Sequence, residues 1–143
     1  TSFTHHPFLQ RFTLEVPDNR FHNAFLNVPL DTMMTLIERS IHHHHPVCWE
    51  GDISEKGFNW QQGIADVDAT DLPITAEKRQ KAFENDQTTD DHVMEMMGLA
   101  QDNKGKKYII CKNSWGKTNR FGGFIFLSYD YIKLKTIAIM VKL

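Results

Sequence analysis

The sequence is poor in cysteine, in long apolar runs and in excess charge of either sign, and each shortage narrows the possible class of protein. Two cysteines in 143 residues cannot build a disulfide framework. No apolar run approaches the roughly 20 residues that span a bilayer. Sixteen basic against 18 acidic residues give a net charge of −2, so the chain lacks the basic excess typical of nucleic-acid binding.

The chain also lacks an initiator methionine and a signal-peptide pattern. Its first residues, Thr1-Ser2-Phe3-Thr4-His5-His6-Pro7, contain neither a basic start nor an apolar stretch. We interpret this as a processed or truncated start, which leaves the cellular compartment open. The length suits one compact domain, and with no internal repeat or linker we expect a single domain over residues 1–143.

The remaining patterns predict a mixed α+β protein. Residues 3–16 read as an extended segment, and residues 29–41 as a helix with one apolar face that includes Leu30, Met33 and Ile37. Thr75 is a candidate cap for a second helix near 76–85. Short strands are expected at 46–50, 92–100, 107–113, 122–128 and 136–142. Such spacing favours an antiparallel sheet that curls into a partial barrel with a few packed helices.

The region with the clearest chemistry begins at His92. A turn at 102–105 makes the two strands around it a hairpin, which brings His92 and Asn113 to the same end. The amide oxygen of Asn113 could accept a hydrogen bond from the imidazole and set its tautomer, leaving the other ring nitrogen to act as a base. Trp115 could cover that bond. The alternative is a strand histidine beside a turn asparagine, with neither residue catalytic.

The residues around this pair resemble the papain-like cysteine peptidases. The Lys112-Asn113-Ser114-Trp115-Gly116 run resembles the Asn-Ser-Trp-Gly signature of these enzymes, and Phe121-Gly122-Gly123-Phe124 resembles the glycine-aromatic strand that follows it. The chain resembles the bleomycin hydrolase branch, also called aminopeptidase C, at residues 1–8, 15–19, 52–58 and 88–92. These matches run in order along nearly the whole chain.

The resemblance implies the C-terminal, barrel-like part of a papain-like fold. It assigns His92 as general base and acid, Asn113 as the residue that orients it, and Trp115 as its shield. It also implies aminopeptidase activity without a cofactor, a peptide substrate, hexameric rings and the cytoplasmic compartment of the family. The family's C-terminal arm, which reaches into the cleft, would begin where this sequence ends, so a role for that arm is not expected here.

A nucleophilic cysteine and the glutamine of an oxyanion hole cannot be placed in the sequence. Cys48 and Cys111 each lie in an apolar strand-like run, where a buried thiol is the expected state. The chain therefore has two interpretations. It is part of a cysteine aminopeptidase whose nucleophile lies elsewhere, or it is a catalytically silent β-rich module that binds a peptide, a missing N-terminal half or a second copy of itself.

Three other groups of polar residues could suggest metal sites, but another interpretation is favoured for each. The run His42-His43-His44-His45 points in several directions at a helix end, and a solvated helix terminus is the favoured interpretation. His5 and His6 are interpreted as structural. Asp66, Asp68 and Asp71 lack the spacing of a calcium loop. No metal is therefore expected.

Overall fold

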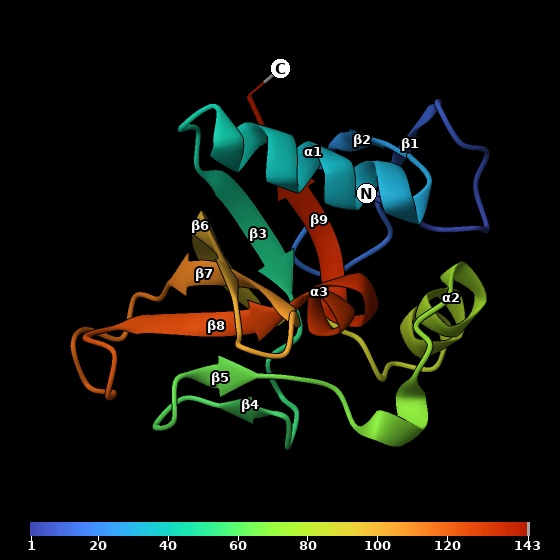
Figure 1. The fold of residues 1–143 in the computed structure, drawn as a ribbon. Coiled ribbons are helices and arrows are strands. Elements are labelled where there is room, and N and C mark those ends of the chain that lie inside the picture. The colour runs from blue at the N-terminus through green and yellow to red at the C-terminus, as the bar shows by residue number, and fades with distance from the viewer. Residues whose placement is uncertain (143) are drawn as a thin grey trace.

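The computed structural model describes residues 1–142, in which helices cover a twisted sheet (Figure 1). The helices are α1 (Leu30–His42), α2 (Ala76–Glu84) and α3 (Tyr129–Lys135), with a short 3-10 turn at Ala69–Asp71. The strands are β1 (Arg11–Thr13), β2 (Ala24–Leu26), β3 (Val47–Gly51), β4 (Phe58–Asn59), β5 (Ile64–Ala65), β6 (His92–Gln101), β7 (Lys107–Lys112), β8 (Phe124–Ser128) and β9 (Thr136–Met140).

Seven of the strands form one open sheet in the order β4-β5-β8-β7-β6-β3-β9. Its neighbours pair antiparallel except β5 and β8, which are parallel. The five strands expected from the sequence are β3, β6, β7, β8 and β9. The partial barrel stays open because β4 and β9 end the sheet without pairing to each other, and the parallel pair departs from the all-antiparallel expectation.

Helix α1 lies across β3 and β9 and presents the apolar face expected from its spacing (Figure 1). Met33 and Ile37 are fully buried, and Met34 and Ile41 are nearly so. The main core lies between this helix, α3 and the inner face of the sheet. Its largest buried side chain is Trp49, whose Nε1 donates a 2.7 Å hydrogen bond to Thr136 Oγ1.

Helix α2 begins at the predicted cap, where Lys78 N donates to Thr75 Oγ1 over 3.2 Å. Helix α3 was not expected, because its Tyr-Asp-Tyr-Ile-Lys-Leu-Lys sequence mixes residues that favour strands with residues that favour helices. Ser128 starts it by accepting a 3.0 Å bond from Tyr131 N. Burial of Tyr131 and Ile132 against the sheet then outweighs their local preference.

The extended N-terminal segment expected over residues 3–16 is only partly a strand. Turns occupy residues 4–5 and 8–9, and β1 pairs with β2 as a separate two-stranded ribbon. The buried side chain of Asn27 explains this path, because its amide bonds the backbone of Phe3 and His6. A distant amide thus replaces the ladder bonds that a continuous strand would have made.

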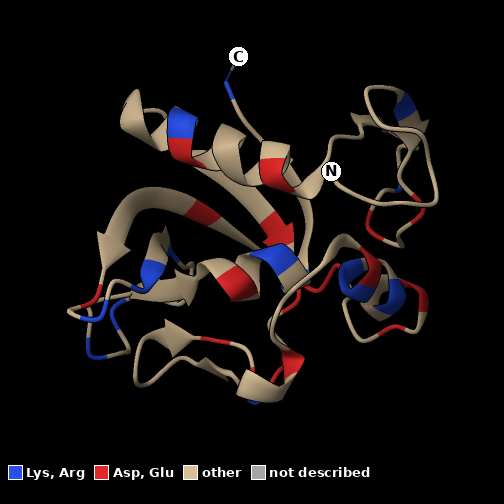
Figure 2. Cartoon of the chain, turned by 45° about the vertical axis from the view of Figure 1, so that its right-hand side comes forward, with Lys and Arg blue, Asp and Glu red and all other residues tan. Residues whose placement is uncertain are grey.

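Acidic and basic residues are both spread over the helices, strands and loops (Figure 2). This distribution matches the near-neutral composition of the chain. Within residues 1–142, no helix is both long enough and apolar enough to cross a membrane.

Candidate active site

The hairpin of β6 and β7 carries the candidate site at its open end. Its strands pair from Gln101 opposite Lys107 to Glu95 opposite Lys112, with a bulge between Met96 and Gly98. At the closed end, Asp102 Oδ1 accepts bonds of 2.8 and 2.9 Å from the backbone N–H groups of residues 104 and 106. This tight turn and the bulge together set the register, which brings the first residue of β6 and the first residue after β7 to the same end of the hairpin.

Those two residues are His92 and Asn113, whose side chains are in contact. His92 Nε2 lies 2.8 Å from Asn113 Oδ1. The same oxygen accepts a 2.7 Å bond from the backbone N–H of Ser114, which can only donate. That bond fixes which end of the amide faces the ring, so the neutral imidazole carries its proton on Nε2. Its Nδ1 is left with a free lone pair, as a general base requires.

Trp115 covers this hydrogen bond, with its ring centroid 5.1 Å from that of His92. Two aromatic residues that the sequence did not single out support it. Trp60 contacts Trp115 edge-on at 5.2 Å, and Phe58 does so at 6.2 Å. Trp60 Nε1 also donates to Thr118 Oγ1, which in turn donates to the Trp115 carbonyl. Nothing in the spacing of residues 58 and 60 indicates this role, because it depends on β5 pairing with β8.

Gly123 anchors the loop that carries Trp115. Its carbonyl accepts a 3.1 Å bond from Asn113 N, and its N–H donates to Asn119 Oδ1. Gly123 has a φ of +96°, and a Cβ there would lie 2.6 Å from the Gly116 carbonyl oxygen. Only glycine allows the two ends of this loop to approach so closely.

The two aspartates before His92 tie neighbouring loops to the start of β6. Asp90 accepts a 2.7 Å bond from Asp18 N, and Asp91 accepts a 2.9 Å bond from Ile53 N. These contacts give both carboxylates a structural role at the entry to the strand. Asp18, Glu50 and Asp90 also lie together, and burial and these neighbouring acids raise the pKa of Glu50.

Neither cysteine lies in surroundings that favour a thiolate. Cys48 is half-buried on β3, where burial and then Glu50 and Glu95 raise its thiol pKa. Cys111 is fully buried on β7, and burial raises its pKa well above the usual range. A nucleophilic cysteine needs the opposite shift. Cys111 therefore matches the expectation of a buried thiol, whereas Cys48 is only partly buried.

The other polar groups flagged in the sequence make contacts within the protein. His43 and His45 use Nδ1 to bond the backbone carbonyls of Arg39 and His43. Asp66 pairs with Lys106 and accepts a 2.6 Å bond from Ser128 Oγ. Asp68 caps the 3-10 turn through Thr70. His5 and His6 contact Glu15 and are considered separately below.

Comparison with solved structures shows which proteins share the fold of this chain. The chain resembles the structure of PepW from Lactobacillus rhamnosis HN001 with a TM-score of 0.75 and 19% identity, over 97% of this chain and 33% of PepW. It thus spans about a third of the length of PepW. The bromelain protease from Ananas comosus matches with a TM-score of 0.46 and 19% identity, over 80% of this chain and 46% of bromelain. A comparison with curated protein sequences finds no match.

The similarity to PepW confirms the predicted papain-like α+β fold class. The sequence model of the Peptidase C1-like family matches residues 2–143, nearly the whole chain. The chain therefore belongs to the Peptidase C1-like family, and its function is related to that of the cysteine peptidases.

Proposed function

We propose that this chain is the histidine- and asparagine-bearing part of a cysteine aminopeptidase of the bleomycin hydrolase type. The observation that carries the proposal is the 2.8 Å contact between His92 and Asn113, together with the Ser114 bond that fixes the amide. This arrangement leaves His92 Nδ1 bare and directed away from Asn113. The restriction to aminopeptidase chemistry is supported by the sequence motifs that resemble that branch.

In the proposed mechanism, His92 Nδ1 accepts the proton of a cysteine thiol that another segment of the enzyme supplies. The thiolate attacks the peptide carbonyl carbon, and His92 returns the proton to the leaving amine as the carbon–nitrogen bond breaks. A water molecule then hydrolyses the thioester, again with His92 as the base. Asn113 holds the ring throughout, and Trp115 keeps water from competing for its hydrogen bond.

A cleft beside this pair is where we place the missing half of the enzyme or its substrate. The cleft has a volume of about 730 Å³ and reaches Asn113 from the outer face of the sheet. Its walls include Val93, which is 53% exposed, and Met140, which is 71% exposed and lies on the unpaired edge of β9. Exposed apolar side chains at a sheet edge are typical of a surface that another chain covers.

The test is an assay of the protein as its gene encodes it, with an aminoacyl coumarin amide as substrate. We expect turnover that iodoacetamide abolishes, and the Nα-acetylated substrate should not react because an aminopeptidase needs a free amino group. His92→Gln should lower kcat about 10⁶-fold, as loss of the base does in other nucleophilic peptidases. Activity that survives this substitution within tenfold would refute the assignment of His92.

The raised pKa values of both cysteines favour a second candidate for the 143-residue chain on its own. In that case the chain is a catalytically silent module that binds a peptide or another chain through the same cleft. Light scattering should then show self-association, and the chain should lack thiol-dependent aminopeptidase activity. Thiol-dependent turnover by the isolated chain would exclude this second candidate.

A further inference from the structure

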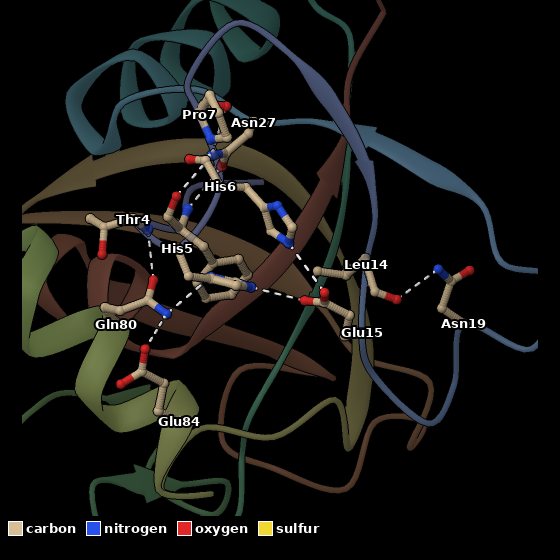
Figure 3. Close-up of polar contacts among 11 residues, drawn as sticks. Thr4, His5, His6, Pro7, Leu14, Glu15, Asn19, Asn27, Gln80 and Glu84 are labelled. Atoms are coloured by element: carbon tan, nitrogen blue, oxygen red, sulfur yellow. Dashed lines mark hydrogen bonds and ion pairs between the residues drawn. The ribbon is translucent and has the colours of Figure 1, made fainter.

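Three side chains of types that can ligate a metal meet outside the candidate active site (Figure 3). They lie in the N-terminal layer, by which we mean the segment before α1 that contains β1 and β2. His5 Nε2 lies 2.9 Å from Glu15 Oε2, and His6 Nε2 lies 3.2 Å from Glu15 Oε1. One ligand atom from each of the three residues lies within 4.8 Å of the other two. The turn at residues 4–5 brings the two consecutive imidazoles to the same side, with their centroids 4.4 Å apart.

A buried amide holds the backbone that carries these histidines. Asn27 has no exposed surface, and its Nδ2 donates 2.8 Å bonds to the carbonyls of Phe3 and His6. Its Oδ1 accepts a 2.9 Å bond from Phe3 N. Because the segment is held on both sides of His5, its imidazole approaches Glu15 without a further loss of backbone freedom.

The imidazole rings are also oriented by their neighbours. His6 stacks on Phe12 at a centroid distance of 4.0 Å and an interplanar angle of 22°. His5 is held from the other side by Gln80 of α2, whose Nε2 lies 3.0 Å from His5 Nδ1 (Figure 3). Both rings are thus fixed in position, as a defined metal site requires, but Gln80 donates to the ring nitrogen that would itself have to donate in the metal-bound state.

We propose that His5, His6 and Glu15 bind a divalent first-row transition ion, with Zn²⁺ as the expected occupant. Two imidazole nitrogens and one carboxylate oxygen form a common zinc ligand set, which leaves one position for water. Zinc bonds of about 2.0–2.2 Å place tetrahedral ligands about 3.3 Å apart. The two nitrogen–oxygen distances, 2.9 Å to Oε2 and 3.2 Å to Oε1, involve different oxygens of Glu15, so only one of them belongs to such a set. One ligand atom from each residue nevertheless lies within 4.8 Å of the other two, so modest rotation of the side chains would complete the geometry.

Binding requires a change of tautomer at His5 that can be followed directly. Gln80 Oε1 accepts from Thr4 N over 2.6 Å, and its Nε2 donates to Glu84 over 2.9 Å. The amide therefore donates to His5 Nδ1, and the proton of the ring lies on Nε2. When zinc takes Nε2, that proton moves to Nδ1, and Gln80 rotates so that the second lone pair of its Oε1 accepts it. Glu15 then loses its hydrogen bonds with His5 and His6 and binds the ion instead.

The ion would join the segment before β1 to the end of that strand, and through His5 to α2. A ligand that binds only the folded state raises stability by mass action. The site would therefore hold the N-terminal layer together. This inference does not depend on the proposed peptidase function.

The run of four histidines after α1 is a rival metal site within the same chain. His44 has a φ of +59°, while His43 and His45 bond backbone carbonyls through Nδ1. Residues 42–45 are not among the described residues whose ligand atoms converge. They could still bind ions loosely, so the experiment needs a background in which all four are glutamine.

The experiment measures Zn²⁺ binding by calorimetry and Co²⁺ binding by visible absorption in that background. We expect one ion per chain. His6→Gln and Glu15→Gln should each weaken binding at least about tenfold, the smaller effect seen when even an outer partner of a metal ligand is lost. Both residues are on the surface, and unchanged amide NMR spectra would show that the variants fold.

Imidazole NMR gives the second readout. Addition of Zn²⁺ should move the His5 proton from Nε2 to Nδ1 and shift the Nε2 signals of both residues, while His92 stays unchanged. The proposal is overturned if replacement of residues 42–45 abolishes binding, or if His6→Gln and Glu15→Gln bind as tightly as the background. It is equally overturned if the His5 tautomer does not change.

Discussion

His92 and His5 both pair with a side-chain amide and both carry the ring proton on Nε2, yet the amide contacts a different ring nitrogen in each pair. At His92, the amide oxygen of Asn113 accepts from Nε2 and leaves Nδ1 bare. At His5, the amide nitrogen of Gln80 donates to Nδ1, and Nε2 keeps its proton toward Glu15. The same two functional groups thus leave Nδ1 bare at His92 and occupied at His5.

The difference lies in what holds the far side of each amide. The N–H of Ser114 requires the oxygen of Asn113 at that position, whereas Thr4 N and the Glu84 carboxylate hold the amide of Gln80 the other way round. A histidine beside an amide is therefore not assignable by itself. Its tautomer follows from neighbours that only donate or only accept.

The largest expected effect follows from Asn113→Ala. Without the amide oxygen, His92 loses the acceptor that holds its proton on Nε2, and the ring is free to change tautomer and orientation. In the protein as its gene encodes it, kcat should fall about 10²–10⁴-fold, the usual contribution of a positioned general base. Imidazole NMR of the same variant should show a mixture of tautomers at His92. Asn113→Asp, which keeps an acceptor, is the control, and a pure Nε2–H form in Asn113→Ala would contradict the comparison.

The second largest effect is expected on the stability of the N-terminal layer, which holds His5 and His6. Asn27→Ala removes a fully buried amide and leaves the backbone groups of Phe3 and His6 without partners. We expect the free energy of unfolding to fall by about 1–3 kcal/mol, measured by urea denaturation. His5 and His6 NMR signals should broaden, whereas those of His92 should not change because the two sites lie in separate layers. Broadening at His92 as well would show that the sites are coupled.

Gln80→Leu sharpens the comparison at lower cost to stability. The substitution keeps the bulk of the side chain in α2 but removes the donor to His5 Nδ1 and the acceptor for Thr4 N. We expect a loss of about 1 kcal/mol in the free energy of unfolding. The tautomer of His5 should become mixed while that of His92 remains Nε2–H. A His5 proton that stays fully on Nε2 would mean that Glu15, and not Gln80, sets its position.

The smallest effect is the pH dependence that comes from Glu15. The hydrogen bond from His5, with a second from His6, lowers the pKa of this carboxyl below its usual value. The unfolded chain therefore binds the proton more readily, so the stabilising contribution is present above about pH 4.3 and is lost as the pH falls through the lowered pKa. Urea denaturation from pH 5 to pH 3 should show a shallower decline for Glu15→Gln than for the wild type. Parallel curves would show that the two hydrogen bonds do not stabilise the fold.

The sequence predicted those elements whose order depends on local spacing. The apolar face of α1 follows from the positions of Met33 and Ile37, and the β6–β7 hairpin follows from two strand-like runs around a turn built on Asp102. Helix α3 could not be predicted in this way. Its residues give mixed local preferences, and the helix forms because it buries Tyr131 against the sheet.

The side-chain contacts of the candidate active site and of the His5–His6–Glu15 cluster show the same difference between local and tertiary causes. The sequence by itself determined that His92 and Asn113 lie at the same end of a hairpin, because a short turn joins the two strands, while the bulge between Met96 and Gly98 set their final register. Only the tertiary structure decided that Trp60 supports Trp115 and that consecutive histidines both face Glu15. Those contacts depend on the packing of β5 on β8 and on the buried amide of Asn27. The physical reason is that a short turn limits its neighbours to a few geometries, whereas contacts between distant segments depend on how the whole core packs.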